Sequence, residues 1–207
     1  MSSFSLNSAA RAALSAQEYR ALFERIVASG EPYGPPGGGY GADYTKLNLA
    51  RTRRIEKTFK VLPEVQAVLG SLAPQTWLVI TEPWCGDSAQ NLPVLQRLAE
   101  LAPSVEFRIA LRDEDTQLID RFLTNGARSI PKLIAFDPTN EAVRFMWGPR
   151  PQAAHDLVMA NKTKPADEQL SKEALAEALH RWYHENGGHD VQMEMGSLLS
   201  EAYSALN

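Results

Sequence analysis

Short apolar runs alternate with amphipathic segments from residue 74 onward, and this alternation constrains the fold more than any other feature of the chain. Between the apolar runs, residues 86–101 repeat leucine on one helical face, and residues 116–125 repeat apolar side chains before Gly126, a natural helix cap. Four runs have the β-branched and aromatic content of buried strands: residues 76–81, 105–111, 132–136 and 143–147. The order β-α-β-α-β-β predicts an α/β sandwich, a mixed β-sheet flanked by helices.

The first 70 residues have a helical pattern and predict an α-helical N-terminal extension, residues 1–70. Ser15 suits the N-cap of a helix that Gly30 ends. Residues 43–72 are again helical, with an interruption at Pro63. The extension is therefore expected to consist of helices joined by a loop.

That loop is residues 30–41, which hold six of the chain's 13 glycines and three of its 13 prolines. It is not a phosphate-binding P-loop, because no Gly-Lys-Ser/Thr follows it. Two interpretations stay open: a lid near the cysteine, with Tyr33 and Tyr40 as contact groups, or a plain linker.

Beyond the last strand, helices are expected at about residues 151–162 and 171–186. The chain then divides into the extension, a core at residues 71–165, and a C-terminal helical segment at residues 166–207 that packs on the core. A chain of 207 residues can bury enough surface to fold without disulfides or a structural metal.

Composition excludes several classes of function. A single cysteine rules out an internal disulfide and Cys-rich zinc sites. A formal charge of −4 counts against general nucleic-acid binding. No apolar run approaches the ~18 residues of a membrane span, and the N-terminus lacks the apolar stretch of a signal peptide. We expect a cytoplasmic protein with neither nucleic acid nor membrane as a partner.

The single cysteine, Cys85, stands where the first strand meets the first core helix. The unpaired N–H groups and dipole of a helix N-terminus stabilise a thiolate, and Ser88 can donate a hydrogen bond to it. Asp87 acts in the opposite direction, because a carboxylate disfavours a second negative charge nearby. On balance we expect a pKa below the ~8.5 of a free thiol. The alternative is an inert, buried thiol.

Four landmarks occur in order at the junctions of these elements: Trp84-Cys85-Gly86, Pro93 in the following helix, Ser129-Ile130-Pro131 before a strand, and Gly148 after the last strand. Over residues 76–162 the chain resembles the thioredoxin family. The resemblance implies a thioredoxin-like sandwich. It also implies a cis Ile130–Pro131 bond that lies against Cys85.

The resemblance also implies roles for the site residues. Cys85 would be the nucleophile and Ser88 its stabiliser. Substrate would contact Trp84, Gly86, Ile130 and Pro131. Two family features are replaced: Ser88 stands where a second cysteine would resolve a mixed disulfide, and Val79 stands where a buried acid would accept its proton. A dithiol reductase is therefore not expected.

A monothiol thiol-disulfide oxidoreductase remains as the leading hypothesis. Cys85 would attack one mixed disulfide, and an external thiol such as glutathione or bacillithiol would resolve it. No bound cofactor is expected, and the partner would be a small thiol or a protein that bears a thiol or disulfide. The alternative is a non-enzymatic binding module that uses the same groove. A third hypothesis is a glutathione-linked transferase in which Cys85 orients a bound thiol.

Two other clusters allow both a functional and a structural interpretation. Residues 46–60 carry six basic side chains against Glu56 alone, which fits an anion-binding surface or a solvated helix face. His180 and His184 have the i, i+4 spacing of metal ligands, but Arg181 lies between them and no HExxH motif is present. We expect no metal site.

Overall fold

A computed structural model describes residues 4–37 and 41–204 of the chain. Its sheet has the order β2-β1-β3-β4, with β1 parallel to β2 and antiparallel to β3, which pairs antiparallel with β4. The strands are β1 (Gln75–Thr81), β2 (Val105–Leu111), β3 (Lys132–Phe136) and β4 (Val143–Trp147). β1 and β3 are buried along their whole length, as their unbroken apolar runs predict. The predicted α/β sandwich around a mixed sheet is confirmed.

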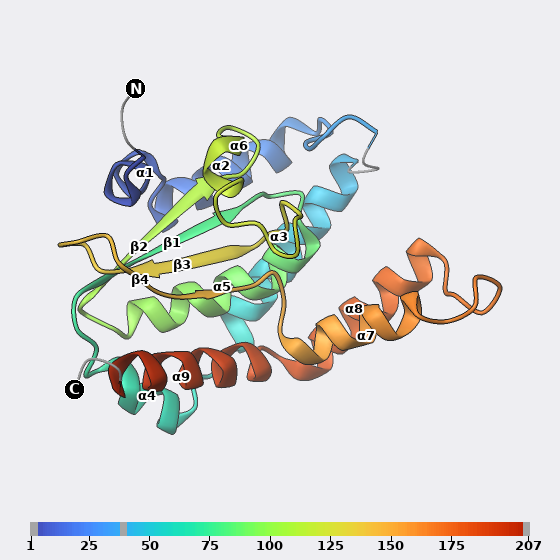
Figure 1. Ribbon diagram of the computed structural model, residues 1–207. Helices are drawn as coiled ribbons and strands as arrows, with labels where there is room; N and C mark the ends of the chain where they lie inside the picture. Colours follow the sequence, from blue (N-terminus) through green and yellow to red (C-terminus); the bar gives the residue numbers. More distant parts are fainter. Residues whose placement is uncertain (1–3, 38–40, 205–207) are drawn as a thin grey trace.

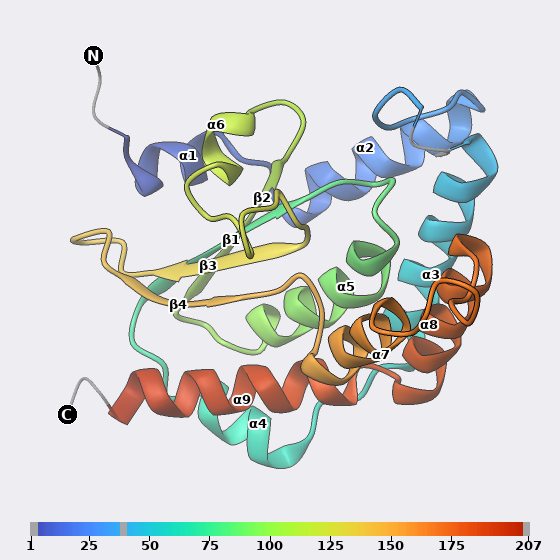
Figure 2. The ribbon, with the colours of Figure 1, turned by 45° about the vertical axis from the view of Figure 1, so that its right-hand side comes forward.

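Helices cover both faces of this sheet. Figures 1 and 2 show α1 and α6 on one face and α5, α4 and α9 on the other. The helix bounds are α1 (Leu6–Ala12), α2 (Ala16–Ser29), α3 (Ala42–Thr58), α4 (Pro63–Leu69), α5 (Gly86–Glu100), α6 (Thr116–Ile119), α7 (Gln152–Lys162), α8 (Lys172–Asn186) and α9 (His189–Ser204). The larger apolar core lies between α5 and the sheet, and a second one lies under α1 and α6.

The helix predicted between Ser15 and Gly30 is confirmed, the helical stretch predicted over residues 43–72 forms the shorter helices α3 and α4, and α1 is not predicted. Ser15 caps α2 through a reciprocal pair of hydrogen bonds with Glu18, and Gly30 ends the helix in the left-handed conformation. Pro63 begins α4, where its missing N–H costs nothing. Local sequence chemistry is therefore sufficient to set these boundaries.

The helix predicted over residues 116–125 is wrong in its second half. α6 ends at Ile119, and Gly126 is not its cap. Asn125 and Gly126 both have positive φ and turn the chain between Thr124 and Ala127, which exchange two backbone hydrogen bonds of 3.0 Å. Asn-Gly strongly favours such a tight turn, and this preference outweighs the helical periodicity.

The helices expected at about residues 151–162 and 171–186 are confirmed as α7 and α8, whereas α9 has no counterpart among the predicted helices. α8 ends at Gly187 in the left-handed conformation, Gly188 also has positive φ, and α9 begins at once. α9 packs against α4, α5 and β4. α7 and α8 instead pack on each other and form a separate small core of Ala154, Val158, Leu179 and Tyr183.

The chain before α2 is joined to the sheet by backbone pairing. Leu14 and Ile109 exchange two hydrogen bonds of 2.8 Å at the outer edge of β2. At the opposite edge, the Glu141 carboxylate accepts hydrogen bonds from the first backbone amides of α1. In the Gly/Pro loop, Tyr33 is described and Tyr40 lies outside the described residues. Within the described chain, no helix has both the length and the apolar character needed to cross a membrane.

Candidate functional site

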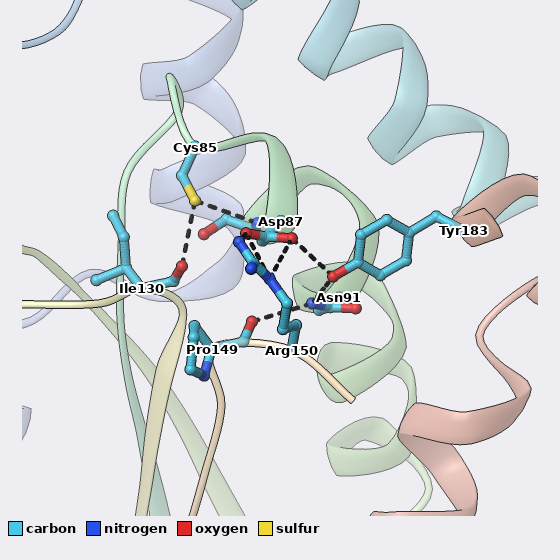
Figure 3. A network of polar contacts seen from close by, with 8 residues as sticks. Cys85, Asp87, Asn91, Ile130, Pro149, Arg150 and Tyr183 are labelled. Carbon is cyan, nitrogen blue, oxygen red and sulfur yellow. Dashed lines mark hydrogen bonds and ion pairs between the residues drawn. The ribbon is translucent and has the colours of Figure 1, made fainter. Parts of the chain in front are cut away.

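Cys85 occupies the N-cap of α5, immediately after the buried strand β1. Its thiol donates a hydrogen bond to the Ile130 carbonyl, with Sγ and the oxygen 3.3 Å apart, and Sγ accepts a bond from the Ser88 amide at 3.5 Å. Figure 3 shows Cys85 and Ile130 facing each other across this contact. The Ile130–Pro131 bond is cis, as predicted. Cys85 thus meets this loop through the Ile130 carbonyl.

The predicted lowering of the Cys85 pKa is wrong. Burial, together with a smaller contribution from the neighbouring Asp87 carboxylate, raises the pKa of this thiol to about 11. The side chain is only 8% exposed, so a thiolate would lose most of its hydration. Hydrogen bonds from Ser88 and Asp87 favour the thiolate, but they do not offset the loss of water. The resting cysteine is therefore a protonated thiol, as its hydrogen bond to Ile130 also requires.

Ser88 lies beside the sulfur, one helical turn from Cys85. It is 1% exposed, and its hydroxyl is near enough to favour the thiolate. That hydroxyl has no hydrogen-bond partner, and the backbone amide is the group that bonds Sγ. The expected hydrogen bond from the Ser88 hydroxyl to the Cys85 Sγ is thus absent in the protonated thiol.

Gly86 is covered by side chains from α3 and α8. A Cβ at this position would lie 2.6 Å from the Tyr44 hydroxyl and 3.0 Å from the His180 ring. Only glycine allows both to approach the start of α5 so closely. No sequence signal pointed to Tyr44, and His180 stood out only for its spacing from His184.

His180 is held in its neutral form. Burial, together with a smaller contribution from Arg51, lowers its pKa to about 4. Its Nδ1 lies 3.3 Å from the Gln90 amide nitrogen, which makes Nδ1 the acceptor and leaves the proton on Nε2. His180 belongs to no cluster of three or more potential metal ligands among the described residues.

A polar network at the N-terminus of α5 holds Asp87 in place (Figure 3). Its carboxylate accepts from both Nε and Nη2 of Arg150, the latter at 2.5 Å, and from the Tyr183 hydroxyl at 2.8 Å. Asn91 donates to Tyr183 and to the Pro149 carbonyl. The second residue of the helix is therefore linked to the connection between β4 and α7 and to α8, segments far away in the sequence.

Trp84 forms a rim on the other side of Cys85. It is 6% exposed, its Nε1 donates to Asp113 at 3.1 Å, and the Arg112 guanidinium lies over its ring at 4.6 Å. Behind it, the buried Glu82 carboxylate accepts from the Asp113 amide and from the Tyr33 hydroxyl of the Gly/Pro loop. Burial raises the pKa of Glu82 to about 7.

Cys85 lies in the lining of a cleft of about 710 Å³. Cys85, Trp84, Gly86 and Ile130 form one wall, and side chains of α7 and α8 form the other. Its charged lining residues are Asp87, Arg112, Arg128, Arg150 and Lys162. The predicted positions 84–86 and 130 therefore come together. Val79 is part of the main core, where it provides no acid.

The basic segment at residues 46–60 forms ion pairs with α2, of which the pair to Glu24 neutralises one of its basic side chains. Arg53 pairs with Glu24, and Arg20 pairs with Glu56. Arg54 turns toward α5, where it donates to Gln90. These contacts give the segment a structural role between helices.

Comparison with known proteins agrees with this fold. No curated protein matches the chain. The solved structure of PA1234, a protein of unknown function from Pseudomonas aeruginosa, has a TM-score of 0.56 and 18% identity and covers 91% of this chain and 99% of its own. A crystallised HIV epitope-scaffold has a TM-score of 0.54 and 17% identity and covers 86% of this chain and 97% of its own.

A family model described as thioredoxin matches residues 37–169. The match includes α3, the whole sheet and α7, and it stops before α8. Ala176, Leu179 and His180 of the cleft therefore come from a part of the chain that the family model does not cover. The chain belongs to the thioredoxin family.

Proposed function

We propose that the protein is a monothiol thiol-disulfide exchange protein that reacts through Cys85. The observation that supports this proposal is the position of Sγ. The chain's single thiol stands at the N-cap of α5, on the wall of a cleft, and 3.3 Å from the carbonyl before the cis-proline. A disulfide seated in this cleft would bring its sulfur to Cys85.

The exchange takes two balanced steps. Cys85 first releases its proton to solvent, and the thiolate attacks one sulfur of a disulfide R–S–S–R′. A Cys85–S–S–R bond forms while R′–S⁻ leaves. An external thiolate then attacks the R sulfur, so that R leaves on a new disulfide and Cys85 is regenerated as a thiolate. Ser88 cannot perform the second step, which is why the resolving thiol must be external.

The raised pKa makes this a slow, pH-dependent reaction. With a pKa of about 11, roughly one molecule in ten thousand carries the thiolate at pH 7. The rate should rise about tenfold for each pH unit until the thiol titrates. A reducing compartment such as the cytoplasm would keep the single thiol available.

The test uses an uncharged disulfide, 2-hydroxyethyl disulfide, with adduct formation followed by mass spectrometry from pH 7 to pH 10. The wild type should gain one adduct at a rate that rises with pH, and Cys85→Ser should gain none. The protein unfolded in guanidinium reports the reactivity of the free thiol. If the folded protein gains no adduct while the unfolded one reacts, exchange at this site is ruled out.

The raised pKa also favours a second candidate, a binding module that uses the same cleft without chemistry. In that case Cys85 would act as a buried hydrogen-bond donor to Ile130. A partner captured by wild type should then bind Cys85→Ser with similar affinity, and no covalent complex should appear.

A further inference from the structure

The lining of the Cys85 cleft is basic, in contrast to the chain as a whole. Four lining side chains are cationic: Arg112, Arg128, Arg150 and Lys162. Asp87 is the one acidic lining residue among those described, and Arg150 neutralises it. The whole chain carries a formal charge of −4. The electrostatic potential in the cleft therefore favours the binding of an anion, although the protein as a whole is acidic.

Not all of these cations are equally available to a ligand. Arg150 is committed to Asp87, and Arg112 is held by Asp113 and by the face of Trp84. Lys162 lies at the end of α7; its carbonyl accepts from Gln169, but its side chain makes no hydrogen bond or ion pair among the described residues. Arg128 donates to Asp120 through Nε at 2.6 Å and Nη2 at 2.8 Å, but its side chain is about half exposed and its Nη1 has no partner among the described residues, so this nitrogen can donate to an anion. Lys162 and Arg128 are therefore the groups that can receive an anion.

The remaining lining suits a small, partly apolar molecule. Val158, Met159 and Leu179 line the cleft together with Ile130, and Met159 is 40% exposed. A volume of about 710 Å³ lies within the range of small-molecule sites, roughly 300–1,000 Å³. A ligand here would have an apolar or sulfur-bearing centre and negatively charged ends.

We propose that the cleft takes a low-molecular-weight thiol with two carboxylates, or its mixed disulfide, and that Lys162 and Arg128 bind the carboxylates while the sulfur faces Cys85. This inference rests on the proposed function and names the chemical class of its external thiol. In this proposal Lys162 and Arg128 determine which thiol binds. Neither residue takes part in the thiol-disulfide exchange itself.

Binding is tested apart from exchange by working in the full-length Cys85→Ser protein. Reduced glutathione serves as the probe in calorimetric titrations, and its diethyl ester, which lacks both negative charges, serves as the matched probe. Lys162→Gln and Arg128→Gln should each weaken glutathione binding about fivefold or more. The ester should bind weakly to all variants, and added salt should weaken glutathione binding.

Two matched variants serve as controls. Lys164→Gln removes an exposed lysine outside the lining, and Arg97→Gln removes an exposed, ion-paired arginine on α5. Both should bind glutathione as the Cys85→Ser parent does. The inference is overturned if the parent fails to bind glutathione at millimolar concentration, if the ester binds equally well, or if the Lys162 and Arg128 variants bind like the controls. None of these outcomes decides whether Cys85 reacts with 2-hydroxyethyl disulfide. The proposed function is therefore tested independently of this inference.

Discussion

Asp87, two residues after the cysteine, forms a bidentate ion pair with Arg150, although 62 residues lie between the two along the chain. Their side chains are 12% and 22% exposed, respectively. The Asp87 carboxylate raises the pKa of Cys85, and the Arg150 guanidinium compensates part of that negative charge. The pair therefore helps to set how much thiolate the site contains.

Asp87→Asn should lower the pKa of Cys85, because it removes a negative charge beside the sulfur and leaves Arg150 in place. The rate of alkylation by iodoacetamide at pH 8 should rise several-fold. Loss of the pair should also lower the free energy of unfolding by about 1–3 kcal/mol. Asp167→Asn, on the exposed connection after α7, is the matched control. An unchanged pH–rate curve for Asp87→Asn would show that the carboxylate does not act on the thiol.

Gly86→Ala should destabilise the protein by about 1–3 kcal/mol, because the new methyl group would overlap the Tyr44 hydroxyl and the His180 ring. Urea unfolding measures the effect. Gly70→Ala is the matched control, since its nearest neighbour would be the Ala67 carbonyl at 4.0 Å, and it should be close to neutral. Tyr44→Phe should partly restore the stability of Gly86→Ala by removing the oxygen. Equal stability of the two alanine variants would contradict the packing described here.

Glu82→Gln should flatten the dependence of stability on pH. The folded-state pKa of Glu82 is about 7, above its ordinary 4.5, so the folded protein keeps this proton where the unfolded chain has lost it. Protonated Glu82 makes its full contribution to the free energy of unfolding below pH 4.5. This contribution is lost as the pH rises toward 7 and above. The loss amounts to about 3 kcal/mol at pH 8.

The glutamine variant should therefore be more stable than wild type at pH 8 and similar to it at pH 4, as measured by urea unfolding at both values. Glu114→Gln, which changes an exposed carboxylate nearby, should show no such difference between the two pH values. A Glu82→Gln variant that is less stable than wild type at pH 8 would mean that the hydrogen bonds to Asp113 and Tyr33 outweigh the cost of burying the charge.

Ser88→Cys should form an internal disulfide with Cys85 under mild oxidation, because Ser88 lies one turn away and its amide already contacts Sγ. Thiol titration before and after oxidation detects the bond. Ser197→Cys, on the exposed side of α9, should keep both thiols. Disulfide reductase activity of Ser88→Cys should stay slow, since the buried Val79 provides no base. Two free thiols after oxidation would contradict the geometry of the α5 start.

Local sequence chemistry by itself determined the strands of this protein and the boundaries of α2. The apolar runs at residues 105–111, 132–136 and 143–147 coincide with β2, β3 and β4, because a strand of that composition is stable only when buried in a sheet. Ser15 and Gly30 bound α2 because their effects act over one helical turn. The position of Cys85 at a helix start and the closeness of Ile130 followed from the family resemblance.

Only the tertiary structure decided the chemistry of the cysteine. Its protonation depends on water excluded by distant segments, and a helix N-terminus cannot outweigh that burial. Arg150 reaches the site from the connection between β4 and α7, and Tyr183 and His180 reach it from α8. Packing brings them together, and no spacing along the chain encodes their meeting. Hydrogen bonds and charges act through space. Local patterns can therefore place the thiol, while its pKa and the ligands it meets depend on how the whole chain packs.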